Sequence, residues 1–171
     1  MFEGLERFSG RVAVNGTDSQ SGFAALQLAL LRPEGSPRAL DIDQSGSHRQ
    51  SIQAVAEGRA ELAAIDAVSF RLGLRHMPEA SAVTVVGCTR PTPGLPLITA
   101  RPAVELEPMR AAVREAIAGL DEECRDALLL TGFEVFEDGA YDVVEAGWRL
   151  LQARSLTVAG GPADVTAVGI R

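Results

Sequence analysis

The chain has 171 residues, of which 46% are hydrophobic, and this length is enough for a buried core and suggests one domain or slightly more. Its formal net charge is −7 and all its basic residues are Arg, which argues against a nucleic-acid or anionic-membrane surface, because such surfaces need clustered positive charge. The absence of Lys excludes Schiff-base chemistry, pyridoxal-phosphate catalysis included, and ordinary phosphate-loop nucleotide hydrolysis.

Strand and helix signals alternate from Gly10 to about Cys88, which is the pattern of βαβ units around a mainly parallel sheet. We predict strands near residues 11–15, 38–42, 61–66 and 82–87. Helical spacing of apolar residues, ended by Pro or Gly, predicts helices at about 22–31, 49–57 and 67–76.

The segment from Thr89 to Pro96 holds three Pro and one Gly in eight residues, so we predict a crossover there, neither strand nor helix. Residues 97–99 could form one more strand. We then predict a helix over 103–120, a shorter one near 122–130, an irregular stretch over 131–139 and a last helix near 141–154. The tail 155–171 is either an extra strand or a disordered end.

The two cysteines and the first residues of the sequence bear on the expected cellular location of the chain. Cys88 and Cys124 form no CxxC pair and have no metal-like spacing to His48 or His76, so we expect buried thiols and no metal site. The first residues carry no basic and apolar leader, and no run approaches the roughly 18 apolar residues of a membrane span. As written, the chain is expected in the cytoplasm.

Two strand-to-helix junctions are rich in hydroxyl side chains, the sequence VAVNGTDSQSG at 12–22 and QSGSHR at 44–49. The first N–H groups of a helix lack partners within the helix and lie at the positive end of its dipole. Ser19, Gln20 and Ser21 are therefore placed to present donors to a phosphate-like oxyanion. Ser, Thr, Asp and Asn are also the ordinary N-cap residues, so simple helix capping is the alternative interpretation.

The order of motifs around these junctions carries a family resemblance. The segments SGSH at 45–48 and GRAELAAID at 58–66, followed by TPGLP at 92–96, resemble the phosphate, phosphite and phosphonate substrate-binding proteins of ABC transporters. The resemblance covers about residues 9–135 and implies the type 2 periplasmic-binding-protein fold, an α/β fold in which ligands bind between two lobes.

This resemblance also implies a domain organisation. Residues 9–96 would form one complete α/β lobe with the crossover, 97–154 a mostly helical C-terminal return into the other lobe, and 155–171 a tail of uncertain structure. Family members carry further residues before the strand that opens here, so the first lobe is expected to be incomplete. A periplasmic location follows from the resemblance if an upstream segment is missing.

Binding residues follow from matching the family's motif to this chain. Ser19 and Ser21, with Gln20 between them, match the hydroxyl-rich helix start that grips the oxyanion. At the second junction, His48 follows Ser47 and matches the family's binding histidine, which adds a charge-assisted contact to an anion when it donates. The alternatives are helix capping for the serines and a surface histidine at a helix start.

Asp66 lies at the carboxyl end of an apolar strand, where ligands of open α/β sheets bind. In the family, an acidic residue near this place accepts a hydrogen bond from a protonated oxygen or an amine of the ligand. The alternative here is an N-cap for the third helix. Thr92 and Gly94 are expected at the hinge with backbone N–H groups open to the ligand, or in a purely structural crossover. His76 is expected to be a favourable cation at a helix end, without function.

The resulting prediction is a non-enzymatic component of an ABC-type phosphonate or phosphate transport system, with a small oxyanion and the transporter permease as partners. No catalytic residue and no cofactor is expected, because the chain has no nucleophile elbow, no HExxH and no second His placed for a triad. Two alternatives stay open. One is an enzyme of the same fold that uses His48 and Asp66 for acid–base work, and the other is a truncated, non-binding scaffold that self-associates as a homodimer.

Overall fold

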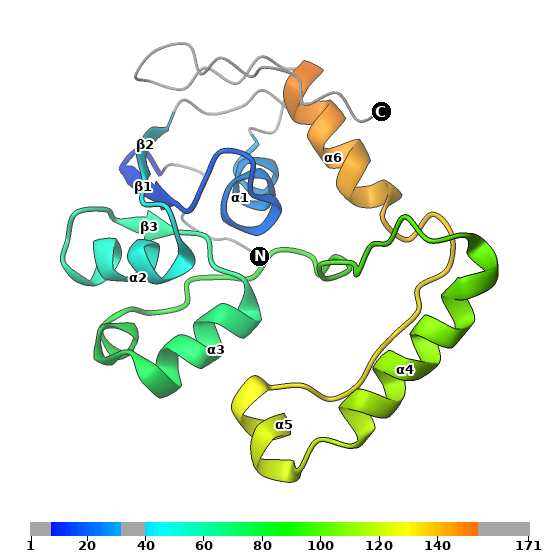
Figure 1. The fold of residues 1–171 in the computed structure, drawn as a ribbon. Coiled ribbons are helices and arrows are strands. Elements are labelled where there is room, and N and C mark those ends of the chain that lie inside the picture. The colour runs from blue at the N-terminus through cyan, green and yellow to red at the C-terminus, as the bar shows by residue number, and fades with distance from the viewer. Residues whose placement is uncertain (1–7, 32–39, 154–171) are drawn as a thin grey trace. The chain divides into compact units, whose positions relative to one another are not determined.

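The computed structural model describes residues 8–31 and 40–153, which form three short strands and a series of helices (Figure 1). These residues divide into two compact units. The first comprises residues 8–31, 40–90 and 144–153, and the second comprises Pro91–Val143. Within the described residues, no helix combines the length and the apolar character that crossing a bilayer requires.

A three-stranded parallel sheet lies at the centre of the first unit. β1 (Arg11–Val14) is the central strand and pairs with β2 (Asp41–Gln44) on one side and β3 (Leu62–Ala63) on the other. The last three residues of β1 are at most 1% exposed. A central parallel strand is covered on both faces, which explains why this strand is a continuous apolar run.

Each strand leads directly into a helical segment. A π-helix, η2 (Gln20–Ala24), follows β1 and continues as α1 (Ala25–Ala29). α2 (His48–Ala56) follows β2, and α3 (Ala67–His76) follows β3, with a 3₁₀ segment η3 (Pro78–Ala82) after it. The predicted helices at 22–31, 49–57 and 67–76 are therefore confirmed to within about two residues, except that the first begins as a π-helix.

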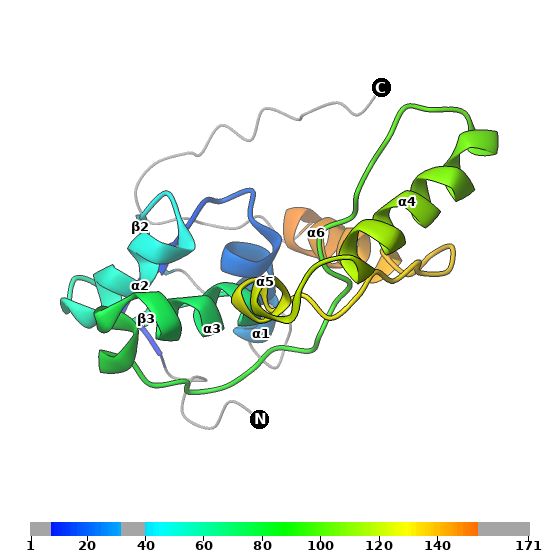
Figure 2. The same ribbon diagram turned by 60° about the horizontal axis from the view of Figure 1, so that its bottom comes forward.

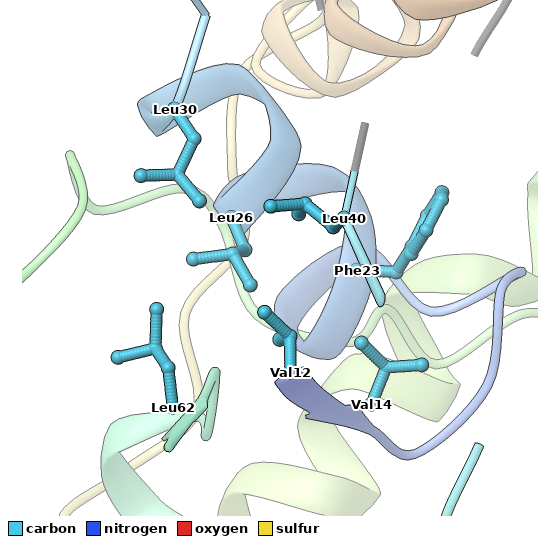
Figure 3. Packing of buried hydrophobic residues seen from close by; sticks show 7 residues of the cluster. All are labelled: Val12, Val14, Phe23, Leu26, Leu30, Leu40 and Leu62. Carbon is cyan, nitrogen blue, oxygen red and sulfur yellow. The ribbon is translucent and has the colours of Figure 1, made fainter. Parts of the chain in front are cut away.

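The helices cover both faces of the sheet because successive side chains of β1 point to opposite sides. Ala13 packs against Ala54 and Ala60, on the face covered by α2. On the other face, against α1, lies the largest apolar cluster, shown in Figure 3: Val12, Val14, Phe23, Leu26, Leu30, Leu40 and Leu62.

α3 and η3 extend the first unit beside α2. Ile52 of α2 packs with Met77 and Ala80, and α2 and α3 lie side by side in both ribbon views (Figure 1, Figure 2). In the strand order β2-β1-β3, the step from β1 to β2 and the step from β2 to β3 run in opposite directions, and α1 and α2 lie on opposite faces of the sheet, as right-handed crossovers would require.

α6 (Asp142–Ala153) packs through its residues 144–153 against α1. The Trp148 ring stacks on Phe23 with ring centroids 6.4 Å apart, and Leu151 is fully buried. At Gly147, an added Cβ would lie 2.8 Å from Cδ1 of Leu28, so the glycine permits the close approach of the two helices.

The second unit contains the 3₁₀ segment η4 (Ala103–Glu105), α4 (Leu106–Ala118) and α5 (Glu122–Leu128). No residue of Pro91–Val143 is buried. Its contacts are made at the surface. They include the Arg114 guanidinium 5.9 Å from the ring centroid of Phe133, the edge contact of the Phe136 and Tyr141 rings at 6.0 Å, and the Tyr141 hydroxyl that donates to the Gly94 carbonyl at 3.0 Å. This unit therefore has helices but no hydrophobic core.

Several predictions about the fold are confirmed and others are wrong. The α/β class with a parallel sheet is confirmed. The helices predicted at 103–120, 122–130 and 141–154 are observed as η4 and α4 over 103–118, α5 over 122–128 and α6 over 142–153. The strand predicted at 82–87 is wrong, as is the one considered at 97–99, because neither segment pairs with a neighbouring strand, although Val83 has extended dihedral angles. Cys88 and Cys124 are exposed, which corrects the expectation of buried thiols.

Two further predictions stay open. Residues 38 and 39 of the second predicted strand and the tail 155–171 lie outside the described residues. Along the chain, the boundaries between the compact units fall between residues 90 and 91 and between residues 143 and 144, whereas the predicted boundary between the lobes falls between residues 96 and 97. The lobe assignment remains a prediction.

Candidate functional site

Three strand-to-helix junctions meet at the carboxyl edge of the parallel sheet. β1 leads into η2, β2 into α2 and β3 into α3, and β1 lies between the other two strands. Helices start on both faces of the sheet at this edge. Ligands of open α/β sheets bind outside the carboxyl ends of the strands, where such a reversal of helix placement occurs.

A network centred on Ser45 joins the first two junctions. Its backbone N–H donates to the Val14 carbonyl at 2.8 Å, and its Oγ lies 3.0 Å from the same oxygen. The Ser45 Oγ also lies 2.6 Å from the Oγ of Ser51, a fully buried residue of α2. Val14 ends β1 and Ser45 follows β2, so these bonds hold the start of α2 next to the end of the central strand.

His48, the first residue of α2, lies where side chains from all three junctions converge. Its Nε2 is 3.1 Å from the Ser21 Oγ and 3.3 Å from Asp66 Oδ2. The side chain is only 16% exposed. His48 is therefore in direct contact with two other residues singled out from the sequence, Ser21 and Asp66, which lie 27 and 18 positions away along the chain.

Asp66 has two roles at once. Its Oδ1 accepts the backbone N–H of Ser69 at 2.8 Å and caps α3, while Oδ2 faces His48. Burial by itself raises the pKa of this carboxyl, but hydrogen bonds from Ser69 and the neighbouring His48 outweigh burial and hold the pKa of Asp66 below its usual value. The side chain is therefore a carboxylate at neutral pH.

Ser19 and Ser47 are N-caps. The Ser19 Oγ accepts the N–H of Gly22 at 3.0 Å, and the Ser47 Oγ accepts the N–H of Gln50 at 3.2 Å. The capping interpretation thus holds for both serines, and a ligand role for them stays a prediction. The side-chain oxygen of Gln20 is buried and has no hydrogen-bond partner among residues 8–31 and 40–153.

Asn15 and Gly22 belong to this cluster but were not singled out from the sequence. Asn15 Oδ1 and His48 Nδ1 are both buried and, within the part of the chain that the structure describes, unpartnered. A Cβ added at Gly22 would overlap Asn15 Oδ1 and lie 3.2 Å from His48 Cε1. The available signal was that Asn15 is the first polar residue after a buried strand, at the edge where ligands bind.

Thr92 and Gly94 belong to the second unit. Thr92 is exposed, and the Gly94 carbonyl accepts the Tyr141 hydroxyl. Their role in ligand binding remains a prediction. His76 ends α3 beside Arg75, as expected for a cation at a helix C-terminus.

The geometry of His48 limits the chemistry of the cluster. In a Ser-His-Asp triad the two ring nitrogens divide the work, one facing the nucleophile and the other the carboxylate. Here Ser21 and Asp66 both face Nε2, so the imidazole is not placed to pass a proton between them. The cluster instead gathers an imidazole ring, a hydroxyl, a carboxylate and, unpartnered among the described residues, the amide oxygen of Asn15, and this set suits hydrogen bonding to a small polar ligand.

An open depression of about 680 Å³ lies at the opposite, amino edge of the sheet. Its two guanidiniums are already paired, Arg11 with Asp41 at 2.9 Å and Arg59 with Asp43 at 3.7 Å, and Arg59 also pairs with Glu57 at 2.9 Å. The two guanidiniums of Arg11 and Arg59 are thus paired with three carboxylates, those of Asp41, Asp43 and Glu57. The depression therefore suits an oxyanion less well than the carboxyl edge does, despite its size.

Comparison with known proteins points to one family. A family model described as an ABC transporter, phosphonate, periplasmic substrate-binding protein matches residues 4–142, which is most of the chain. A search of curated proteins gives no significant match.

Proposed function

Because the chain belongs to the family of phosphonate-binding periplasmic substrate-binding proteins of ABC transporters, we propose that it binds a small phosphonate-type or phosphate-type oxyanion at the carboxyl edge of its sheet. The observation that carries this proposal is the convergence of Ser21, His48 and Asp66 from three junctions on one point.

The chemistry of the cluster supports an anionic ligand that also carries a proton. The continuous helix over residues 20–29 and α2 both begin at this edge, so their N-terminal dipoles favour negative charge. The imidazole and the Ser21 hydroxyl can donate to oxyanion oxygens. The Asp66 carboxylate can only accept, and it would take a hydrogen bond from a protonated oxygen or an amine of the ligand.

We further propose the arrangement that the family implies for the rest of the system. The first unit corresponds to the second lobe of a type 2 periplasmic-binding-protein fold, Thr92 and Gly94 lie at its hinge, and the ligand-bound protein delivers its cargo to an ABC permease in the periplasm. The three-stranded parallel sheet with helices on both faces supports the lobe assignment. Transport proteins of this family bind ligands without changing them, and we propose no catalytic role.

Calorimetric titration with methylphosphonate, phosphate and sulfate tests this function, together with thermal melts at rising ligand concentration. A ligand that binds only the folded chain must raise the melting temperature by mass action. His48→Ala and Ser21→Ala are each expected to weaken binding by about 10- to 150-fold, the range for losing a hydrogen bond to a charged group.

Two matched variants control for general effects of substitution. His76→Ala removes the other histidine, which is exposed at the end of α3, and Ser81→Ala removes an exposed hydroxyl in η3. Both should bind as the natural chain does. Failure of all three oxyanions to bind, with a cooperative melt showing that the chain is folded, would sink the proposal.

A further inference from the structure

We propose that residues 83–89 pair, as an antiparallel β-strand, with the same segment of a second copy of this chain. The inference goes beyond the proposed function and does not rest on it. It assigns an interaction surface to a segment that follows η3 in the first unit, and it names the partner that fits this surface.

The backbone of residues 83–89 has no hydrogen-bonded partner in the described chain. The segment leaves η3 with extended dihedral angles at Val83 and joins no strand of the sheet (Figure 1). No backbone–backbone hydrogen bond links residues 83–90 to any other described residue. None of the seven residues is Pro, so each offers both a donor and an acceptor to a neighbouring strand.

The side chains of the segment also favour pairing. Its sequence VTVVGCT is rich in β-branched residues. Val83 packs against the cluster that contains Ile52, which anchors the start of the segment to the first unit. Val85 and Val86 are 56% and 58% exposed. Proteins usually protect such a segment with a charge, a Pro or a bulge, because an exposed uncharged strand adds readily to another chain.

The charges that flank the segment favour a second copy in antiparallel orientation. Glu79 and Arg90 enclose ten uncharged residues. When two copies pair about a two-fold axis at Val86, Arg90 of one copy lies opposite Ala82 of the other. Glu79 is three positions before Ala82 in the 3₁₀ segment η3, about 6 Å away along its axis, within reach of an Arg side chain.

Opposite charges therefore meet at both ends of the antiparallel pair. The Glu79 carboxylate accepts a hydrogen bond from Gln53 Nε2 at 3.3 Å, which holds it on the side of α2. Parallel pairing of the same segments would bring Glu79 next to Glu79 and Arg90 next to Arg90, and like charges directly opposite each other are destabilising. The charge pattern thus selects the antiparallel arrangement, in which each copy presents the same surface to the other.

The dimer is expected to be weak. Seven residues from each copy form a smaller contact than the roughly 800 Å² per partner of a standard interface. We expect dimers to form over protein concentrations of about 10 µM to about 1 mM. Sedimentation equilibrium of the full chain over this range measures the association. A chain that is still monomeric at about 1 mM would overturn the inference.

Substitutions at Val86 test the two-fold axis. Val86→Lys and Val86→Glu each place two like charges opposite each other, so each variant alone should be monomeric, with a cooperative melt because the position is exposed. An equimolar mixture of the two variants should dimerise, because Lys then faces Glu. Leu74→Lys, at a position of α3 that is 49% exposed, is the matched control and should dimerise as the natural chain does.

Two further measurements locate and orient the pairing. Amides within residues 83–89 should exchange more slowly at high than at low protein concentration, because a ladder protects them. Arg90→Glu replaces both attractive end contacts with repulsive ones and should weaken dimerisation at least about twofold. A dimer without this protection, variants of Val86 that dimerise alone, a mixture that stays monomeric, or unchanged dimerisation of Arg90→Glu would each overturn the proposed antiparallel pair.

Discussion

At the level of single residues, the lack of a side chain at Gly22 allows Asn15 and His48 to lie close to the backbone of η2. In Gly22→Ala, the new Cβ would collide with Asn15 Oδ1 and crowd the His48 ring. We expect a loss of about 1–3 kcal/mol in the free energy of unfolding, the usual cost of an added methyl in a packed site. Urea denaturation followed by circular dichroism measures this loss.

Introducing Gly22→Ala into a second variant shows whether the Asn15 side chain causes this loss of stability. In an Asn15→Ala chain the closest obstacle is gone, so Gly22→Ala should cost clearly less there than in the natural chain. Equal costs in the two backgrounds would mean that the collision with the Asn15 side chain is not what makes glycine necessary at this position.

Asp66 makes the free energy of unfolding depend on pH in the acid range. Burial raises the pKa of its carboxyl, but the hydrogen bonds from Ser69 and the nearby His48 lower it further than that, so the folded pKa lies below the unfolded one. The unfolded chain therefore binds this proton more readily, and the stability that Asp66 contributes above about pH 4 is lost as pH falls through the folded pKa. Asp66→Asn should flatten this acid-side loss.

Thermal melts of the natural chain and Asp66→Asn at pH values from about 7 to about 3 measure the effect. The difference in melting temperature between the two chains should shrink as the solution becomes more acidic. A difference that is constant over this range would show that Asp66 acts only as a neutral cap.

That Ser21, His48 and Asp66 lie close together could be predicted from the sequence, but the way their side chains pack could not. Ser21, His48 and Asp66 stand at strand ends in a recognisable order, and parallel pairing brings strand ends to one edge. Which ring nitrogen faces which partner depends on side-chain geometry, which no sequence pattern encodes. The involvement of Asn15 and Gly22 depends likewise on a close approach between residues seven positions apart, across a turn that ends in a π-helix.

At the level of elements, Ser45 joins β1 to α2. Ser45→Ala would remove its Oγ from between the Val14 carbonyl and the buried Ser51 hydroxyl, leaving Ser51 without this partner. Because a buried polar group that loses its partner costs about 1–3 kcal/mol, we expect a destabilisation of that size in urea denaturation. Ser81→Ala, at an exposed position, should change stability by less than about 0.5 kcal/mol.

The same variant separates local from general effects. If the Ser45 network holds the start of α2 against β1, amide hydrogen exchange in Ser45→Ala should speed up most at the beginning of α2. Uniform acceleration across the first unit would instead indicate a general loss of stability.

Helices were predictable in this chain because their signals are local. Asp66 before Ala67 marks the start of α3 and Pro78 its end, and both bounds are as predicted. Strands depend on partners elsewhere in the chain. Residues 83–87 have the β-branched composition of a strand and the extended backbone at Val83, yet they form no ladder, because composition cannot supply the neighbour.

At the level of the whole molecule, the two units differ in how their residues are buried. The first unit has apolar clusters on both faces of its sheet, whereas no residue of Pro91–Val143 is buried. Burial of apolar surface is the main source of stability, so the helices of the second unit should open far more readily. Amides of α4 are expected to exchange at least about tenfold faster than those of β1.

Hydrogen exchange followed by mass spectrometry of peptic fragments measures this difference. Leu95 and Ile98 are 98% and 89% exposed, so their region should also be cut first by a protease that favours apolar residues. Protection of α4 equal to that of β1 would show that the second unit is stabilised by contacts other than those described above.

The central position of β1 also affects how the chain folds during its synthesis on the ribosome. Of the three strands of the sheet this one is synthesised first, and its partners follow much later. Arg11 pairs with Asp41 thirty positions on, and its backbone N–H donates to the Glu61 carboxylate fifty positions on. Until then the apolar side chains of Val12 and Val14 have no sheet to join, and parallel pairing between distant segments is slow. The apolar side chains of β1 therefore stay uncovered in the nascent chain until β2 and β3 have been synthesised, and we expect a chaperone to have its largest effect on folding during this interval.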